Sequence, residues 1–600
     1  MFLPQLKQKP AQQAVTEVFG GINRAEEISD GQFSAAMNLS TREFPMLCPR
    51  KPRGIGTAIE GTYRGMMEKN GKLVTLIGSA VKYGSDTVGI TLSEAANMMP
   101  KRMVGMGAYV LIFPDKKYFN SLDLTDCGSI EATYTSTGNI TYTMCRLDGT
   151  DFGNVTESDT PPSDPDSGDY WIDTSSTPHK LMMYSEITGL WSQIMTVYTR
   201  ISASGISDNF SAGDTVEISG VSGESGEVAN QLAALNGSQY IYDKGEDWIT
   251  VLGLLDETVT QSTGSITLKR ECPDMDFVIE DSNRLWGCRY GKDSGGQMLN
   301  EIYACKLGDF RNWRVYQGTS QDSYTVSVGS DGPFTGAIAY GGMPMFFKQD
   351  CVHKIYGNKP SNYQVLTTQM HGVQRGSDKS LVIVDGTLLY LSAYGVEMYD
   401  GSQPQRVSQA LGEGTMKDGV AGAIGGKYYL IVTEGENKHM YVYDLSKNIW
   451  QEENAENVLA FVRTGNDLYM LTEHRADTIL GSAGTPEKTV HWWAETGLQG
   501  WEQHSKKVMG AADDKYITRF QIRAVLPEGS SLKCGMRYDG STFWEEKLRI
   551  ENNWNNTRTM LMPVYPKRCD YMHMRLEGTG DIKVQAIIRN LSSGGDGRRG

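Results

Sequence analysis

The side chains best able to bind metal or act as nucleophiles are scattered along this chain. Nine cysteines occur without a Cys-x-x-Cys pair, and eight histidines occur without a His-x-His or His-Glu-x-x-His pattern. Structural and catalytic zinc sites draw on ligands at such short spacings. The sequence therefore predicts no metal site, no cofactor and no disulfide framework, and most of the cysteines are expected to be buried and reduced.

Other catalytic motifs are also missing from the sequence. It contains no Gly-x-Ser-x-Gly nucleophile elbow and no phosphate-binding loop. The segment Ser327–Gly332 is a distant echo of the Ser-x-Asp-x-Gly box of sialidase-like enzymes, and no other segment repeats it. We expect a protein that is not an enzyme, with a glycosidase pair of carboxylates as the alternative.

Two groups of aspartates are candidate calcium ligands. The first is Asp123 with Asp126, and the second is Asp164, Asp166 and Asp169 within a loop rich in proline and serine. The spacing of an EF-hand loop is absent from both. Solvated loops are therefore the favoured interpretation of these aspartates.

Aromatic side chains offer a different chemistry, the stacking of sugar rings. Trp171 and Trp191 lie in one stretch of alternating polarity, and Trp492 and Trp493 lie much later. Exposed aromatic faces bury a large area at a small entropy cost, so Trp171 and Trp191 are a candidate ligand platform. Packing in a core is the competing interpretation, because tryptophan on a sheet is usually buried.

A cluster of cations near the N-terminus has two interpretations. Arg50, Lys51 and Arg53 follow a proline-rich stretch and precede the repeats described next. They are candidate oligomer contacts, able to pair with acidic groups of a neighbouring subunit. Salt-bridged packing of this arm within its own chain is the alternative.

Seven short turns recur between apolar or aromatic runs of the chain. They are Asn70-Gly71, Gly105–Gly107, Asp281-Ser282-Asn283, Gly341-Gly342, Asp385-Gly386, Gly425-Gly426 and Gly465-Asn466. The last four, marked by Gly342, Asp385, Gly425 and Gly465, are 43, 40 and 40 residues apart. A period of about 40 residues with roughly four strands per repeat is typical of a β-propeller. The chain is therefore expected to be all-β, with a propeller of seven blades and with six or eight as alternatives.

Length and composition place further units around the propeller. A chain of 600 residues exceeds one hydrophobic core, and its 67 glycines suit a protein rich in turns. Two stretches, 11–18 and 227–236, have helical spacing. The expected units are an N-terminal arm (1–55), the first part of the propeller (56–124), an inserted β-rich domain (125–272), the second part of the propeller (273–500), a C-terminal β-sandwich (501–592) and a flexible tail (593–600).

Charge and hydropathy limit the classes of partner and the cellular location that we expect for this protein. The formal net charge of −15 disfavours a dedicated nucleic-acid binder and suits a surface that must not hold passing DNA. No apolar run approaches the length of a membrane span, and the first residues do not look like a signal peptide. We expect synthesis in a cytoplasm without classical secretion.

The arm carries a resemblance to a known family. Its motif is Phe19-Gly20-Gly21-Ile22-Asn23-Arg24, then Asn38-Leu39, then Pro-x-Leu-x-Pro-Arg-Lys-x-Arg-Gly ending at Gly54. This pattern resembles the opening of tail nozzle proteins of short-tailed bacteriophages, the family of tail tubular protein B and the packaged-DNA stabilisation proteins. The segment Leu389–Gly401 is similar to a blade that recurs in that family.

The resemblance implies a function that composition alone does not. Its members form a ring, commonly sixfold, at the distal end of a tail, through which double-stranded DNA leaves the virion without specific binding. Implied partners are further copies of the chain, other tail, portal or adaptor proteins, and tail fibres; no catalytic residue is implied. The hypotheses are thus a structural virion protein of the tail, with contacts between subunits made by the arm and the sandwich, or a carbohydrate- or receptor-binding propeller.

Overall fold

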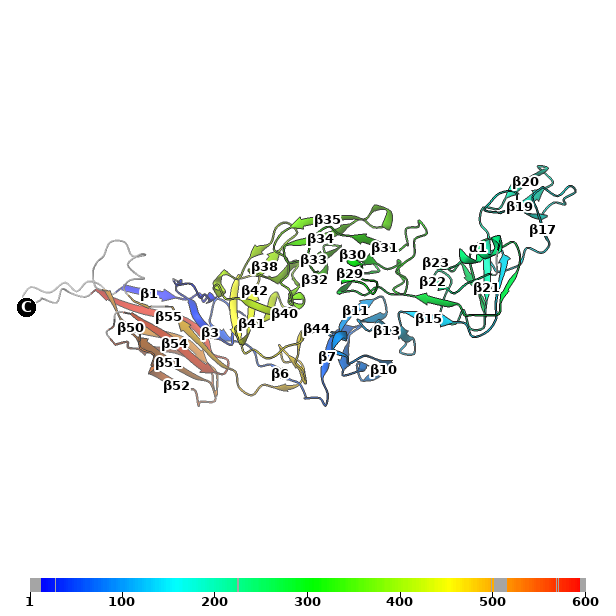
Figure 1. The fold of residues 1–600 in the computed structure, drawn as a ribbon. Helices are drawn as coiled ribbons and strands as arrows, with labels where there is room; N and C mark the ends of the chain where they lie inside the picture. The colour runs from blue at the N-terminus through cyan, green and yellow to red at the C-terminus, as the bar shows by residue number, and fades with distance from the viewer. Residues whose placement is uncertain are drawn as a thin grey trace, which may run out of the picture.

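The chain folds almost entirely into β-strands. The computed structural model describes residues 12–26, 28–223, 226–497, 499–500, 515–567, 569 and 571–593, and α1 (Glu227–Ala233) is the one α-helix of that part of the chain. A β-sandwich near the C-terminus, a β-propeller and an inserted β-domain follow one another along an elongated molecule (Figure 1). The predicted all-β class with these three units is confirmed, as is a helix near 227–236.

The propeller has seven blades, and the first strand of each lies nearest the axis. Blades 1 to 3 consist of β7 (Tyr63–Lys69), β8 (Lys72–Ile77), β9 (Ala80–Tyr83) and β10 (Asp86–Thr91); β11 (Arg102–Met106), β12 (Tyr109–Phe113), β13 (Lys117–Asn120) and β14 (Cys127–Ser129); and β28 (Phe277–Asp281), β29 (Arg284–Lys292), β30 (Met298–Ala304) and β31 (Tyr324–Ser327). Blades 4 to 6 consist of β32 (Gly336–Tyr340), β33 (Met343–Phe347), β34 (Cys351–Tyr356) and β35 (Gln364–Gln369); β36 (Val382–Val384), β37 (Thr387–Ser392), β38 (Gly395–Tyr399) and β39 (Gln405–Arg406); and β40 (Met416–Ile424), β41 (Lys427–Glu434), β42 (Asn437–Asp444) and β43 (Ile449–Glu453).

The seven turns found in the sequence each join the first strand of a blade to the second. Most place residues at positive φ, as at Asp385 (47°) and Gly386 (83°) or Gly425 (59°) and Gly426 (70°). Two-residue hairpin turns with positive φ match the right-handed twist of the strands that they connect, and glycine, asparagine and aspartate tolerate them. The number of these turns thus equals the number of blades, which confirms the predicted seven.

Blade 7 closes the ring with a strand from the start of the chain. It consists of β44 (Ala460–Thr464), β45 (Asp467–Leu471), β46 (Ala476–Thr478), β6 (Gly54–Ile55) and β47 (Thr485–Pro486). β6 lies between β46 and β47, with Gly54 opposite both Thr478 and Pro486. The first strands β44 and β7 then contact each other, so that the end of the propeller is tied to its beginning.

The inserted domain leaves the propeller between blades 2 and 3. Its two larger sheets are β15 (Ala132–Thr135), β27 (Thr267–Arg270), β22 (Thr215–Ser219) and β23 (Gly237–Tyr240); and β24 (Asp243–Lys244), β25 (Trp248–Leu252), β21 (Tyr198–Ser202), β16 (Ile140–Cys145) and β26 (Val259–Gln261). A distal sheet consists of β17 (Val155–Ser158), β18 (Tyr170–Asp173), β19 (Lys180–Ser185) and β20 (Leu190–Gln193). The expected boundary at residue 125 falls inside blade 2, because β14 is the fourth strand of that blade.

The sandwich draws on both ends of the chain. One sheet is β1 (Gln12–Thr16), β55 (Lys583–Ser593), β50 (Lys515–Leu526) and β53 (Arg558–Val564). The other is β2 (Gly21–Ile22), β3 (Gln32–Met37), β48 (His491–Thr496), β54 (Tyr571–Thr579), β51 (Ser531–Tyr538) and β52 (Glu545–Glu551), with β49 (Gln499–Gly500) also paired to β54. Phe33, Trp492, Phe520 and Leu576 meet in the shared core.

Three expectations about the chain ends need correction or lie outside the structure. The stretch 11–18, expected to be helical, contains strand β1, because pairing with β55 outweighs its weak helical pattern. The arm is not a separate unit, since β1 to β3 belong to the sandwich and β6 to blade 7; β4 (Leu39–Ser40) and β5 (Cys48–Pro49) join the two. Of the tail expected to be flexible, 594–600 lie outside the described residues.

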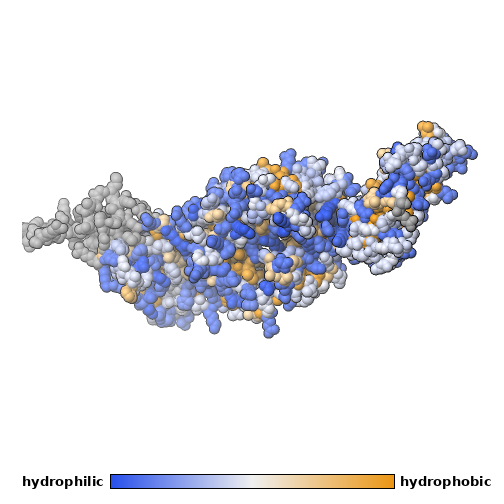
Figure 2. Space-filling view, viewed as in Figure 1, coloured by the Kyte–Doolittle hydropathy of each residue, from blue (hydrophilic) through white to orange (hydrophobic). Residues whose placement is uncertain are grey.

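The remaining helices are single 3-10 turns. They are η1 (Ala96–Met98), η2 (Pro360–Asn362), η3 (Asp378–Ser380) and η4 (Gln409–Leu411). Within the described ranges, no helix has the length and apolar character needed to cross a bilayer. Hydrophobic residues appear as scattered spots on the face viewed in Figure 2, between larger hydrophilic areas.

Candidate functional site

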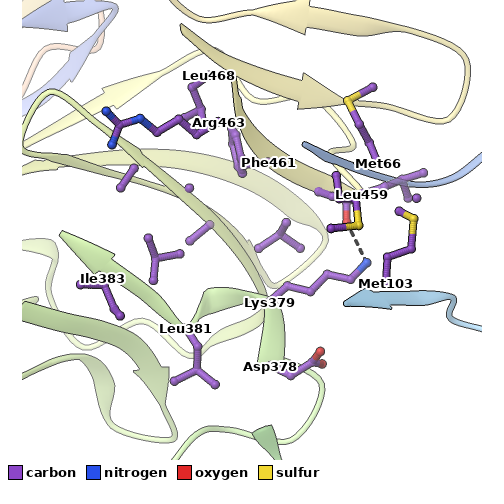
Figure 3. Close-up of a pocket in the computed structure, with 18 of the residues that line it drawn as sticks. Met66, Met103, Asp378, Lys379, Leu381, Ile383, Leu459, Phe461, Arg463 and Leu468 are labelled. Atoms are coloured by element: carbon purple, nitrogen blue, oxygen red, sulfur yellow. Dashed lines mark hydrogen bonds between the residues drawn. The ribbon is translucent and has the colours of Figure 1, made fainter. Parts of the chain in front are cut away.

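A cavity of about 540 Å³ lies on the propeller axis, and we call it the axial channel. Residues from all seven first strands line it, and Figure 3 shows part of this lining. Equivalent blades start at the axis and run outward, so their first strands all point the same way along it. Residues at the starts of these strands therefore share one end of the channel, which we call the entry end.

Cations outnumber carboxylates on the channel wall. The cations are Arg64, Lys101, Arg102, Lys379 and Arg463, and the carboxylates are Asp378 and Asp385. Two cations are neutralised locally: the buried Lys101 Nζ lies 2.5 Å from Asp115, and Arg102 Nη1 lies 2.5 Å from Asp378. Arg102 also lies over the ring of Phe277, 4.4 Å from its centroid.

Three cations of the channel lack a carboxylate partner among the described residues. Arg64 and Arg463 are exposed and form no hydrogen bond or ion pair there. Lys379 reaches across the channel and donates one hydrogen bond from Nζ to the carbonyl oxygen of Leu459, at 2.8 Å (Figure 3). Enclosure by the channel walls disfavours the charged amine and lowers the pKa of Lys379, against the opposing charge of Asp378.

Apolar side chains form much of the remaining channel wall. Met66, Met103, Leu381 and Phe461 line it, together with Ile383, which is 42% exposed. An isoleucine with that much open surface inside a cavity is unusual for a closed core. The channel therefore combines a cationic entry end with an apolar wall.

Sequence reasoning missed the axial channel. Its cations come from blades 1, 2, 5 and 7 and share no motif, and only the closed ring brings them together. One usable signal was present, since each cation lies in or just before the first strand of a repeat. A cation at this position in a repeat can equally well be exposed to solvent, so the sequence does not show that it lines a channel.

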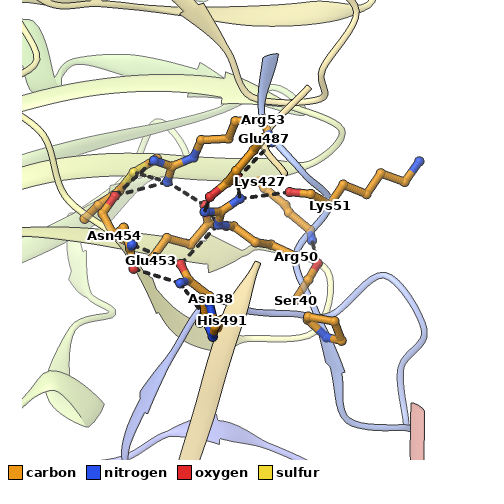
Figure 4. A network of polar contacts seen from close by, with 12 residues as sticks. Asn38, Ser40, Arg50, Lys51, Arg53, Lys427, Glu453, Asn454, Glu487 and His491 are labelled. Carbon is orange, nitrogen blue, oxygen red and sulfur yellow. Dashed lines mark hydrogen bonds and ion pairs between the residues drawn. The ribbon is translucent and has the colours of Figure 1, made fainter. Parts of the chain in front are cut away.

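The arm cations lie in a polar network between the sandwich and blades 6 and 7 (Figure 4). Arg50 is 6% exposed and binds both carboxylate oxygens of Glu487, at 2.7 and 3.0 Å. Arg53 is 4% exposed and donates to Glu453 at 2.9 Å and to the carbonyl oxygen of Asn454 at 3.1 Å. Both guanidinium groups are thus used inside the chain, so the expected oligomer contacts through Arg50 and Arg53 are replaced by the intrachain alternative.

Further contacts fix this network in place. Arg50 Nε donates to Asn38 Oδ1 at 3.0 Å, and Asn38 Nδ2 donates to the carbonyl oxygen of His491 at 2.7 Å. Partial burial would raise the pKa of Glu487, but the hydrogen bonds and charges of Arg50 and Arg53 outweigh it, and the pKa is lowered. Lys51 differs from its neighbours: it is exposed and points away from the network, so its role as an oligomer contact stays a prediction.

The proposed aromatic platform lies in the distal sheet of the insertion. Trp171 on β18 is only 4% exposed and donates from Nε1 to the carbonyl oxygen of Ser158 at 3.0 Å, so it serves the core there. Trp191 on β20 is half-buried and packs edge-on against Trp171, with centroids 5.5 Å apart. Tyr184 packs against the same Trp191 at 5.3 Å. Only Trp191 of the proposed pair keeps surface for a ligand.

The sialidase-like echo lies on the loop between blades 3 and 4. Its Ser330 Oγ lies 2.7 Å from His353 Nε2, and His353 Nδ1 lies 2.9 Å from Thr367 Oγ1. Burial lowers the pKa of His353 to about 4, which leaves the imidazole neutral at pH 7. The arrangement links this loop to strands β34 and β35.

Metal ligands do not gather in the described part of the chain. No group of three or more histidine, cysteine, aspartate or glutamate side chains there is placed to hold an ion. Seven of the nine cysteines are buried. Burial raises the pKa of the Cys305 thiol to about 12, so this thiol is not a nucleophile at neutral pH.

Comparison with known proteins gives no family. No protein-family model and no curated protein sequence matches this chain. Among solved structures, an exo-β-1,3-galactanase from Phanerochaete chrysosporium aligns at 9% identity over 52% of this chain and 94% of its own, with a TM-score of 0.21. An arabinoxylan arabinofuranohydrolase of glycoside hydrolase family 43 from Bacillus subtilis aligns at 9% identity over 53% and 95%, with a TM-score of 0.18.

A third structure covers more of the chain at a lower score. The extracellular domain of a hybrid two-component system from B. thetaiotaomicron aligns at 8% identity over 94% of this chain and 99% of its own, with a TM-score of 0.14. Scores of this size carry no argument about family, ligand or activity. The seven-bladed architecture therefore stands on this chain's own strand pairing.

Proposed function

We propose that this chain is a non-enzymatic structural protein of a bacteriophage tail, a nozzle or hub subunit. In this proposal several copies form a ring, sixfold as the family resemblance implies, around the path of the DNA. The supporting observation is the position of the arm whose sequence carries that resemblance.

Residues of the arm motif join the sandwich to the propeller. At Gly21, a Cβ atom would lie 2.3 Å from the carbonyl oxygen of Trp450, so only glycine lets the arm approach blade 6 this closely. Arg24 follows it, with its backbone nitrogen bonded to the carbonyl oxygen of Ala410 at 2.8 Å and its guanidinium 3.1 Å from Glu452. Gly54 ends the motif inside blade 7.

A ring subunit of a tail has to hold its parts at fixed orientations. The arm contributes strands to both bodies and places buried charged hydrogen bonds between them, which resist sliding more than apolar contacts do. The glycines and arginines of the motif thus hold the sandwich and the propeller together, which is a structural role for the residues that carry the resemblance.

The charge balance also favours passage of DNA over its retention. The formal net charge is −15, and Arg24, Arg50 and Arg53 form ion pairs within the chain. Affinity for duplex DNA depends on free cations near phosphate. A ring of such subunits would repel the backbone of DNA moving through it.

The oligomeric state of the purified full chain tests this proposal. Light scattering coupled to size exclusion should give a multimer, and negative-stain electron microscopy should show rings. Lys51→Glu should weaken the ring if this exposed arm cation faces an acidic neighbour, whereas Lys488→Glu, an exposed cation outside the arm, serves as control. A chain that stays monomeric at all accessible concentrations would count against the proposal.

A second candidate, a carbohydrate- or receptor-binding propeller, rests on the distal sheet. Trp191 is half-buried there, close to the exposed Ile187 (97%), Leu190 (63%) and Met195 (83%). Binding of the full chain to a glycan array, lost in Trp191→Ala, would support this candidate. Equal signals from the variant and the parent protein would remove it.

A further inference from the structure

We propose that the axial channel binds a small amphipathic anion, with its acidic group at the entry end and its apolar body along the channel wall. This site belongs to a single chain, so the inference is independent of the proposed ring. It rests on three features of the channel: uncompensated cations, unused hydrogen-bond donors and exposed apolar surface.

The charge of the entry end favours an anion. Lys101 and Arg102 are neutralised by Asp115 and Asp378, but Arg64 and Lys379 have no carboxylate partner among the described residues. A concave site lined by one sign of charge and by walls of low polarity concentrates the field of that charge. An excess of cations in the channel of an acidic protein is therefore a site for an anionic group.

Unused donors point to the same group. An ammonium has three N–H donors, and Lys379 uses one of them, on the carbonyl oxygen of Leu459 at 2.8 Å. Desolvation by the channel wall outweighs the charge of Asp378 and lowers the pKa of Lys379, so a further anion near Nζ would favour the charged amine. A carboxylate, sulfonate or phosphate bound there would accept hydrogen bonds from Lys379 and from the guanidinium of Arg64, which donates to no described residue. Bonds of this charged kind are stronger than neutral ones.

The apolar wall indicates the rest of the ligand. Besides the cations, the channel is lined by Met66, Met103, Leu381, Phe461 and the 42% exposed Ile383. Covering this surface removes apolar area from water, and methionine side chains adapt to irregular shapes. A purely polar anion such as inorganic sulfate would leave this apolar surface in contact with water.

Size excludes large ligands. The channel volume of about 540 Å³ lies within the roughly 300–1,000 Å³ typical of small-molecule sites. Arg463 lies four residues beyond Leu459, toward the opposite end of the channel and roughly 13 Å along β44. The acidic group is therefore placed with Arg64 and Lys379, and Asp385, which follows β36, lies away from it.

Fluorescence of 8-anilinonaphthalene-1-sulfonate, an anionic probe with an apolar body, tests the proposal on the full chain. Saturable enhancement is expected, with displacement by octanoate but not by the same concentration of sodium sulfate. The double variant Arg64→Gln/Lys379→Gln should bind the probe about tenfold more weakly, as expected for the loss of charge-assisted contacts.

Matched variants separate the channel from other surfaces. Lys292→Gln/Lys438→Gln removes two exposed charges from outer strands of blades 3 and 6 and should bind the probe like the parent protein. Ile383→Ser should weaken binding of the probe and of octanoate without removing a charge. All the substituted residues are exposed, and unchanged melting curves by circular dichroism will show that the variants fold.

Three results would overturn the inference. The first is the absence of saturable binding. The second is equal affinity of the channel double variant and the parent protein, which would place the probe elsewhere, for example on the distal sheet. The third is displacement by sulfate as effective as by octanoate, which would leave no role for the apolar wall.

Discussion

At the scale of single residues, buried charges hold the joint between the arm and the propeller. Glu453 is 5% exposed, and its carboxylate lies 2.9 Å from Arg53 and 3.6 Å from Arg50. In Glu453→Gln both guanidinium groups lose a buried counter-charge, and removing one partner of such a group typically costs about 3–5 kcal/mol. We expect a clear fall in the melting temperature, whereas Glu436→Gln on the surface should melt like the parent protein; a Glu453→Gln variant of unchanged stability would contradict this account.

A second residue predicts how stability depends on pH. The folded state holds the pKa of His353 at about 4, below its ordinary value of 6.5, because burial disfavours the imidazolium. Between these values the unfolded chain binds the proton and the folded chain does not, so stability falls as pH decreases from about 6.5 to about 4, by ~3 kcal/mol in total.

Melting curves across this pH range check the His353 prediction. The parent protein should lose stability more steeply than His353→Gln, in which the titrating group is absent. His474→Gln, which removes an exposed histidine, should keep the steep dependence of the parent. Parallel curves for parent and His353→Gln would show that this imidazole does not contribute.

At the scale of elements, strand β6 decides whether the propeller closes. Gly54 lies so close to the neighbouring backbone that a Cβ atom would be 1.8 Å from the carbonyl oxygen of Ala483. Gly54→Ala must displace β6 from β46 and β47, and overpacking of this kind costs typically about 1–3 kcal/mol. Gly329→Ala is the matched control, since a Cβ there meets nothing within 4 Å.

Thermal unfolding and hydrogen exchange measure the effect on the ring. The Gly54 variant should melt at a lower temperature and lose protection first in blade 7 and in the adjoining first strand β7. Equal melting of both alanine variants would mean that β6 is not needed for closure.

At the scale of the whole molecule, the insertion is expected to be separable from the rest. Its first and last strands pair with each other, with Ala132 opposite Arg270, so its two ends leave the propeller side by side. Replacing residues 132–270 by a short glycine-serine linker should leave the propeller and sandwich folded and should not change the oligomeric state. Aggregation or loss of the cooperative transition would show that contacts such as that between Asn312 and Asp214 (2.8 Å) are needed.

The sequence by itself determined the class and the repeat of this protein. The seven turns and the strands beside them are local features, because φ above zero at residues such as Asp385-Gly386 depends only on the residues of the turn. The helix at Glu227–Ala233 and the β-rich insertion could be predicted for the same reason, because their sequence patterns are also local. Strand β1 could not be predicted in this way, since its conformation depends on pairing with β55, more than 500 residues away.

Only the tertiary structure decided how distant segments combine. The sequence alone does not show whether the arm cations pair within the chain or with a neighbouring subunit. In the structure, Arg50 and Arg53 are buried against Glu487 and Glu453 of the same chain. The axial channel arose in the same way, because Arg64 and Lys379 line one cavity only when the seven-bladed ring is closed. Electrostatic partners depend on distance in space, and this chain brings them together from positions that no local pattern connects.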